Sequence, residues 1–102
     1  MSYRLRARPE VRLDIFEAAE WYEEQQEGLG AKFAREALLA IRSLKINPFL
    51  DRIRHRKHQA RWMLLRGFPY RIVFVVEGEV VAVLAVTHAK RHDRHWEERL
   101  RT

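Results

Sequence analysis

The sequence of 102 residues contains no cysteine, which excludes disulfide bonds and thiolate metal sites. It also lacks any apolar run close to the roughly 20 residues that a helix needs to span a bilayer. Residues 1–10 hold no apolar core of a signal peptide. These absences predict a cytoplasmic protein without a membrane partner. The length suits one hydrophobic core, so we expect a single domain over residues 1–102.

Acidic residues are missing from residues 52–76, where seven basic residues occur. The balance reverses in residues 9–37, which hold eight acidic and three basic residues. The net charge of the whole chain is +6. This separation predicts a basic face that meets a polyanion or an acidic protein partner. The alternative is a solvated basic surface with no special partner.

Apolar runs in the second half of the chain predict consecutive antiparallel strands. The runs are Trp62–Leu65, Tyr70–Val76 and Val80–Thr87, with turns at Gly67-Phe68-Pro69 and Glu77-Gly78. Alternation from Ser2 to Arg8 predicts one earlier strand. The segment from Phe49 to Gln59 has no clear period and is predicted to be a loop, with the start of the second strand left open at its end.

Two helices are predicted between the first strand and this loop. In residues 10–26, spacings of three and four give an apolar stripe of Val11, Ile15, Ala18, Ala19 and Tyr22. Acidic residues of this segment are assigned to two places. Glu20, Glu23, Glu24 and Glu27 are placed on a solvated face, and Glu10 and Asp14 are placed near the positive end of the helix dipole. A turn at Gly28-Leu29-Gly30 leads to a second stripe of Phe33, Ala37, Ile41 and Leu44.

The predicted fold class is therefore α+β: an N-terminal strand, an α-helical hairpin, a three-stranded antiparallel meander and a short C-terminal helix. We expect both long helices on one face of an antiparallel sheet. The spacing of Trp96 and Leu100 predicts the closing helix, with Trp96 as a lid on the core.

Basic and imidazole side chains on the strands and the tail are the candidates for function. Contact with a target or a neutralising partner is assigned to Arg61, Trp62, Arg66, Arg71, Lys90, Arg91, His92, Arg94 and His95. If the protein cleaves RNA, arginines hold phosphate and histidine moves protons, which makes the candidates Arg66, Arg71, His88 and Arg91.

Two other interpretations of the tail concern structure and metal. Arg91 can act as a clamp that stacks on an aromatic ring and pairs with Asp93 or Glu97. The spacing of His88, His92 and His95 would suit three zinc ligands on one helix face. Because His88 is expected to end a strand, that spacing fails, and we expect neither a metal nor a cofactor.

Taken in order, these features resemble the RelE/ParE superfamily of bacterial toxins, and in particular its ParE-like, plasmid-stabilisation branch. The matching residues are the helical segment 18–23, Gly28-Leu29-Gly30, Phe33, Pro48, the hairpin segment 65–72, the strand 83–88, Arg91 and Trp96. The resemblance covers nearly the whole chain.

The resemblance implies a toxin of a type II toxin–antitoxin system. In such systems a small basic toxin is neutralised by an acidic, partly disordered antitoxin, which lays a helix or strand over the helical hairpin and the sheet edge. A hetero-oligomer with that antitoxin is therefore expected.

The resemblance leaves the target open between two activities. ParE-like members poison DNA gyrase, whereas RelE-like members cut mRNA on the ribosome. RelE-like toxins carry a tyrosine near the C-terminus, but the last tyrosine here is Tyr70. The expected function is gyrase inhibition by binding rather than enzymatic catalysis. The alternatives are a ribosome-dependent endoribonuclease and an inactive toxin-fold binding protein.

Overall fold

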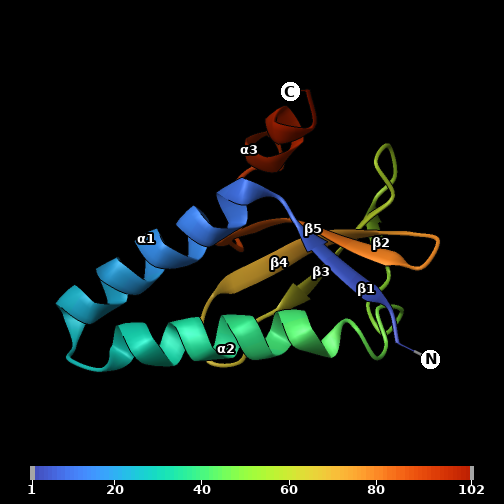
Figure 1. The fold of residues 1–102 in the computed structure, drawn as a ribbon. Coiled ribbons are helices and arrows are strands. Elements are labelled where there is room, and N and C mark those ends of the chain that lie inside the picture. The colour runs from blue at the N-terminus through green and yellow to red at the C-terminus, as the bar shows by residue number, and fades with distance from the viewer. Residues whose placement is uncertain (1, 102) are drawn as a thin grey trace.

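The computed structural model describes residues 2–101 (Figure 1). Its elements follow in the order β1 (Arg4–Ala7), α1 (Pro9–Gln25), α2 (Leu29–Ser43), β2 (Ile53–His55), β3 (Ala60–Leu64), β4 (Tyr70–Glu77), β5 (Val80–His88), α3 (Arg94–Glu97) and the 3-10 helix η1 (Glu98–Arg101). The predicted α+β class is confirmed. None of the described helices is both long and apolar enough to cross a bilayer.

The five strands form one sheet in the order β1-β5-β4-β3-β2. Strands β3, β4 and β5 pair antiparallel, as the meander prediction requires. Strand β1 instead runs parallel to β5, with Arg4 opposite Val80, so the sheet is mixed and the expectation of an antiparallel sheet was wrong. Alternation in a sequence reveals which side chains share a face, but it carries no information on strand direction.

Strand β2 corrects the prediction of a loop between Phe49 and Gln59. It lies inside that segment and pairs antiparallel with β3, with Ile53 opposite Arg61. Because β2 is short and lies at the sheet edge, its side chains need no apolar period. Its own residues are exposed except for half-buried His55, which explains why the sequence pattern missed it.

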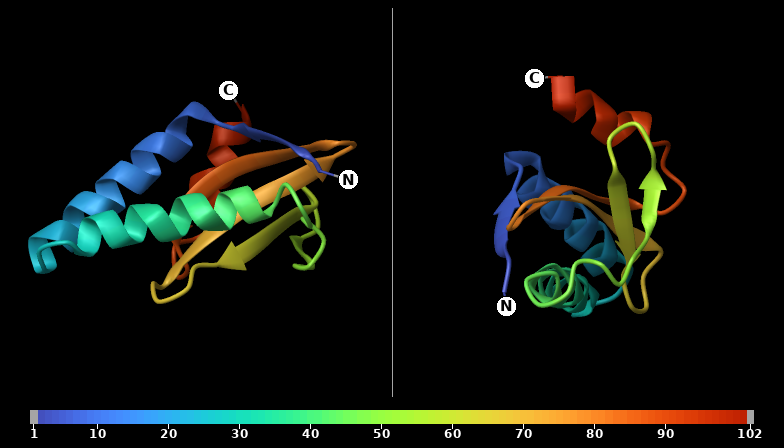
Figure 2. Two further views of the ribbon diagram at one scale, coloured as in Figure 1. Left: turned by 60° about the horizontal axis from the view of Figure 1, so that its bottom comes forward. Right: turned by 90° about the vertical axis from the view of Figure 1, so that its right-hand side faces the viewer.

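Both long helices cover the same face of the sheet, as expected (Figure 2). Their stripes bury Val11, Ala18, Phe33 and Ala37 against the strands. At the turn between them, Gly28 has φ +87°, a conformation that favours glycine. A side chain at Gly30 would meet the carbonyl oxygen of Ala19, so the close approach of the two helices there requires glycine.

Glu23 fastens this turn, which corrects its assignment to a merely solvated face. Its two carboxylate oxygens accept hydrogen bonds from the backbone N–H groups of Gly28 and Gly30, both at 2.9 Å. These are donors that the first turn of α2 cannot satisfy within the helix. The carboxylate therefore caps α2 from the end of α1.

The opposite face of the sheet carries a second, smaller core closed by the C-terminal segment. Trp96 of α3 is fully buried there against Ala60, Val73, Leu84 and Ala85. Trp96 is thus a lid, as predicted, but on the face that the long helices leave open. The C-terminal segment consequently brings charged side chains to both sides of the end of β5.

Candidate functional site

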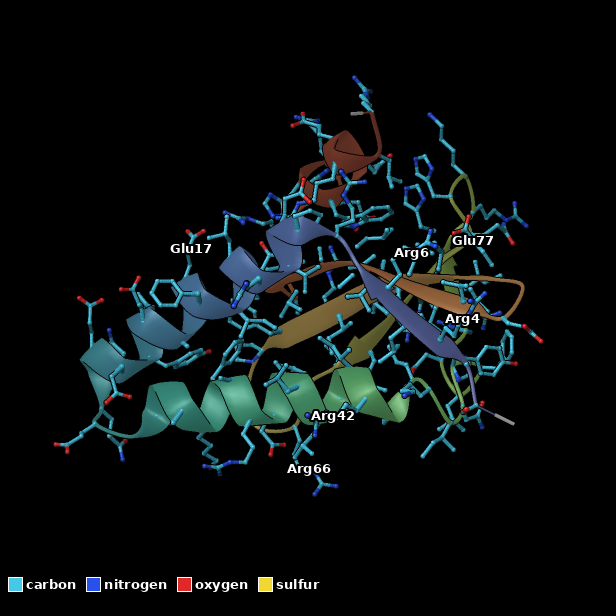
Figure 3. The ribbon with its side chains drawn as sticks, in the orientation of Figure 1. Arg4, Arg6, Glu17, Arg42, Arg66 and Glu77 are labelled. Atoms are coloured by element: carbon cyan, nitrogen blue, oxygen red, sulfur yellow. The ribbon has the colours of Figure 1, made fainter. Side chains whose placement is uncertain are left out.

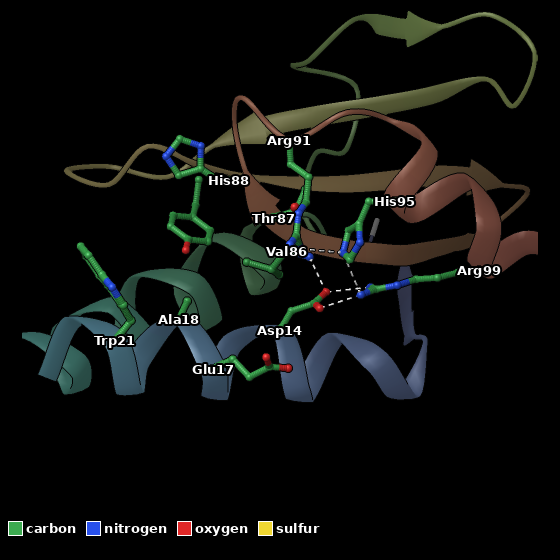
Figure 4. A pocket seen from close by; sticks show the side chains of 11 residues that line it. Asp14, Glu17, Ala18, Trp21, Val86, Thr87, His88, Arg91, His95 and Arg99 are labelled. Atoms are coloured by element: carbon green, nitrogen blue, oxygen red, sulfur yellow. Dashed lines mark hydrogen bonds and ion pairs between the residues drawn. The ribbon is translucent and has the colours of Figure 1, made fainter. Parts of the chain in front are cut away.

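A cleft of about 510 Å³ opens between α1, the end of β5 and the C-terminal segment (Figure 4). It is lined by Asp14, Glu17, Ala18, Trp21, Tyr70, Val86, Thr87, His88, Arg91, His95 and Arg99. Of the residues assigned to function from sequence, His88, Arg91 and His95 meet here. Helix α1 contributes four further lining residues, Asp14, Glu17, Ala18 and Trp21, and the sequence analysis did not connect the polar ones to the tail.

Asp14 and Arg99 form a buried ion pair in the floor of this cleft. The Arg99 Nη1 and Nη2 atoms lie 2.7 Å from the two Asp14 carboxylate oxygens, and both side chains are about one-tenth exposed. Asp14 Oδ2 also accepts the backbone N–H of Val86 at 3.0 Å. Asp14 therefore closes the unpaired edge of β5 and does more than complement the helix dipole.

The sequence contains a signal for this role that the sequence analysis did not use. Asp14 stands three residues after Val11 and four before Ala18, which places a carboxylate within the apolar stripe of α1. A charge at such a position has to be paired when the face is buried.

His95 lies between two guanidinium groups. The Nη1 of Arg91 and the Nη2 of Arg99 each lie 3.2 Å from His95 Nε2. Burial, together with the positive charges of Arg91 and Arg99, lowers the pKa of His95 below its ordinary value. A guanidinium can only donate, so Nε2 is the unprotonated acceptor and the imidazole is neutral.

Arg71 forms a clamp on the other face of the sheet. Its guanidinium carbon lies 4.2 Å from the centre of the Trp62 ring. Its Nη2 donates to Asp93 Oδ1 at 2.8 Å and to the Arg91 carbonyl oxygen at 2.9 Å. The predicted arginine clamp exists, but Arg71 provides it rather than Arg91. Since Arg71 is 3% exposed, its charge is engaged inside the protein.

Asp93 links this clamp to the tail, because Trp96 Nε1 donates to the same carboxylate oxygen at 3.1 Å. Burial opposes ionisation of Asp93, but hydrogen bonds from Arg71 and Trp96 outweigh it and lower its pKa below the ordinary value of an aspartate. A carboxylate with a depressed folded-state pKa stabilises the fold fully above its unfolded pKa. That contribution is lost as the pH falls through the folded pKa.

We therefore expect an Asp93→Asn variant to be less stable than the native chain at neutral pH and to lose less stability on acidification. Urea unfolding at pH values from about 2 to 7 measures both effects. Asp51→Asn is the matched control, since within residues 2–101 the Asp51 carboxylate forms no hydrogen bond or ion pair. An acid profile of Asp93→Asn as steep as that of the native chain would contradict this assignment.

The remaining predicted contact residues lie at the surface or are partly engaged. Half-buried Arg61 donates to the Asp51 carbonyl oxygen at 2.6 Å and lies over the ring of Phe49. Trp62 is half-buried beneath Arg71, with Arg54 at 5.7 Å from its ring. The exposed members are Arg66, Lys90, Arg91, His92 and Arg94, and Figure 3 shows Arg66 extending outward below α2.

The catalytic candidates are distributed over both faces of the sheet. His88 pairs with Tyr70 across the strands and contacts its ring at 5.4 Å, on the side of the long helices. Arg71, one residue along β4, points to the opposite face with Trp62. His88 ends β5, so the helical spacing of the three histidines does not apply. Among residues 2–101, no group of three or more metal-binding side chains is assembled.

A second feature that the sequence analysis missed is an apolar groove on the outer face of the helical hairpin. A cleft of about 300 Å³ runs between α1 and α2 over Phe16, Ala19, Gly30, Ala31 and Ala34, with the acidic residues Glu20 and Glu23 at its border. Phe16 is 58% exposed, and Leu13 and Leu38 beside it are 59% and 50% exposed. Leu13 and Phe16 lie off the buried stripe, and that is the sequence signal for an exposed apolar surface.

Comparison with known proteins identifies the family. The profile of the family described as "ParE toxin of type II toxin-antitoxin system, parDE" matches residues 5–93. The chain belongs to the ParE toxin family. The match includes both helices of the hairpin, the sheet except for Arg4 of β1, and the clamp residue Asp93. The resemblance to the RelE/ParE superfamily is thereby confirmed.

Two solved toxin structures have a fold similar to that of this chain. A chain from the "Chromosomal ParDE TA system from P. aeruginosa" has a TM-score of 0.75 and 14% identity, covering 85% of this chain and 96% of that one. A mutated free form of the E. coli toxin RelE has a TM-score of 0.65 and 20% identity, covering 99% of this chain and 98% of that one. No curated protein matches the sequence. At these identities the structures support the fold.

Proposed function

We propose that this ParE-family toxin inhibits DNA gyrase by binding to it, and that an acidic antitoxin neutralises it by covering the helical hairpin. The family match to toxins of type II toxin–antitoxin systems supports this proposal. The choice of binding over catalysis rests on one observation, which is that Arg71 and His88 lie on opposite faces of the sheet.

Cleavage of RNA requires a proton acceptor, a proton donor and a cationic group that converge on one phosphate. The sheet separates Arg71 from His88, because successive residues of a strand point to opposite sides. In addition, the Arg71 guanidinium is occupied by Asp93 and by the Arg91 carbonyl oxygen. Two of the four predicted catalytic residues therefore cannot act on the same phosphate in this fold.

Exposed cations supply a surface for the target instead. The β2–β3 hairpin carries Arg54, Arg56 and Lys57, all exposed, and the tail after β5 adds Lys90 and Arg94. Clustered positive charge of this kind accelerates association with DNA or with acidic protein surfaces. Under this proposal the hairpin and the tail contact the gyrase–DNA complex.

The groove on the helical hairpin supplies the surface for the antitoxin. Phe16 lines this groove, and exposed Leu13 and Leu38 lie one helical turn from Phe16 and Ala34, so the three suit the anchors of an amphipathic helix. Arg35 and Arg42 are exposed on α2 beside it and can pair with acidic residues of the antitoxin. The groove and the exposed cations of the β2–β3 hairpin are different residues, so separate variants can test the antitoxin contact and the target contact.

The test is a supercoiling and DNA-cleavage assay with purified gyrase. We expect inhibition by the native chain at micromolar concentration, and a clear loss of inhibition in the Arg54→Glu/Arg56→Glu double variant. Phe16→Glu is the matched control, because it should still inhibit gyrase but escape neutralisation by the antitoxin. Unchanged supercoiling and cleavage at micromolar native toxin would overturn the proposal.

One observation favours the ribonuclease alternative, since His88 and Arg91 line the same cleft. Under that alternative, the toxin cleaves mRNA in a translating extract, and His88→Ala or Arg91→Ala abolishes the cleavage without unfolding the protein. Pulse labelling after induction separates the two candidates, because gyrase inhibition stops DNA synthesis first and mRNA cleavage stops protein synthesis first. Normal growth after induction would indicate an inactive binding protein.

A further inference from the structure

The cleft between α1 and the C-terminal segment has two chemically different ends. Figure 4 shows Trp21 and His88 at one end and Arg91, His95 and Arg99 at the other. Its volume of about 510 Å³ lies within the range of small-molecule sites, which is roughly 300–1,000 Å³. Neither gyrase contact nor the antitoxin groove uses this combination of residues.

The cationic end carries one positive charge that no carboxylate balances. Asp14 neutralises Arg99 through two hydrogen bonds of 2.7 Å. Arg91 has a neutral partner, His95, and within residues 2–101 its guanidinium forms no ion pair with a carboxylate. Both guanidiniums reach the same neutral imidazole nitrogen, so two cations lie close together, and Asp14 is the carboxylate bonded to Arg99. A further anion at Arg91 would relieve this repulsion and would find several N–H donors.

The other end is aromatic and accessible. Trp21 is 54% exposed although it borders a cleft, and the rings of Tyr70 and His88 contact each other at 5.4 Å beside it. Burial raises the pKa of Tyr70, so its hydroxyl remains a donor at neutral pH. Exposed aromatic rings at a cleft offer a surface on which a flat heterocycle stacks.

Acidic residues on α1 limit how much negative charge the cleft accepts. Glu17 lies between Trp21 and Asp14 on the helix and faces the cleft, while Glu20 and Glu24 follow on its exposed side. A chain of phosphates along this wall would meet repulsion, whereas a single phosphate at Arg91 would not. The Glu17 carboxylate is placed to accept hydrogen bonds from sugar hydroxyls between the two ends.

The geometry points to a binding site for a nucleoside monophosphate, with the base against Trp21 and the phosphate on Arg91. A free nucleotide and the phosphorylated end of a strand share this chemistry. The inference stands apart from gyrase inhibition, because neither gyrase nor an antitoxin is needed for the site to form.

Calorimetric titration of the full chain with adenosine 5′-monophosphate tests the site. We expect saturable one-to-one binding that is tighter than binding of adenosine, inorganic phosphate or adenosine triphosphate. Titration with a short oligonucleotide, with and without a 5′-phosphate, distinguishes a free nucleotide from a strand end as the ligand. Tighter binding of the phosphorylated oligonucleotide assigns the site to strand ends. Equally weak binding of both oligonucleotides assigns the site to free nucleotides. Absence of saturable binding of the monophosphate would overturn the inference.

Variants test the placement of the two ends. Arg91→Gln should weaken binding by about tenfold or more, the effect of losing hydrogen bonds to a charged group. Trp21→Ala should weaken it by about tenfold through loss of stacking. Arg12→Gln on α1 and Leu39→Ala on α2, both exposed and outside the cleft, are matched controls that should bind as the native chain does. Unchanged affinity in Arg91→Gln, with folding verified by circular dichroism, would overturn the site.

Discussion

Replacing Asp14 with asparagine is expected to lower the free energy of unfolding by about 3–5 kcal/mol, the cost of breaking a buried ion pair on one side. Asp14 and Arg99 are each about one-tenth exposed, so the remaining guanidinium would stay buried without its counter-charge. The variant also weakens the acceptor that closes the β5 edge at Val86. Urea unfolding followed by far-UV circular dichroism measures the change.

Two further variants make this prediction specific. Glu10→Gln removes the carboxylate paired with Arg8 at 3.2 Å on the surface, and should leave the unfolding curve essentially unchanged. The double variant Asp14→Asn/Arg99→Gln should lose less stability than the sum of the single variants, because no unpaired charge stays buried. Additive losses would show that the pair does not act as a unit.

Trp96→Ala is expected to cost about 3–5 kcal/mol of stability, the usual range for deleting a fully buried tryptophan. Trp96 has no exposed surface and packs against the rings of His55 and His58 at 4.9 and 5.9 Å. Its loss would open the core on the face that the long helices do not cover and would remove a hydrogen bond to Asp93. Urea denaturation is again the measurement.

The same substitution at an exposed tryptophan is the control. Trp21 is 54% exposed, so Trp21→Ala should shift the unfolding free energy by only about 0.5 kcal/mol. The free energy of unfolding of Trp96→Phe should lie between those of the two alanine variants. This variant keeps the comparison possible if Trp96→Ala does not fold. Equal stability of the Trp96→Ala and Trp21→Ala proteins would show that the second core contributes nothing.

Local periodicity was sufficient to predict most of the architecture. The stripe containing Val11 and Ala18 and the stripe containing Phe33 and Ala37 are buried as predicted, because a helix brings residues at these spacings to one side wherever it packs. The three-stranded meander could also be predicted from the sequence, since each of its apolar runs is bounded by glycine or proline. These features depend only on neighbours in sequence.

The features that sequence analysis missed depend on partners far along the chain. The place of Asp14 within the apolar stripe of α1 shows that its carboxylate needs a partner, but the sequence does not show that the partner is Arg99. The Arg71–Asp93 clamp likewise joins two residues that no local pattern connects. The same holds for the direction of β1, whose partner Val80 is far from Arg4 in sequence. Strand β2 was missed because edge strands carry charge for solubility rather than an apolar period.

The parallel pairing of β1 with β5 has a consequence for how the protein folds. Within residues 2–101, β1 pairs with β5 alone, with Arg4 opposite Val80, and the Asp14–Arg99 bond joins residues 85 positions apart. Contacts of such high sequence separation form late, because a long loop has to close before they contribute. A chain in which β5 and η1 have not yet docked lacks both closures. The edge formed by β1 and the cleft formed by α1 and η1 are therefore completed late in folding, after the β3–β4–β5 meander, whose strands are neighbours in sequence.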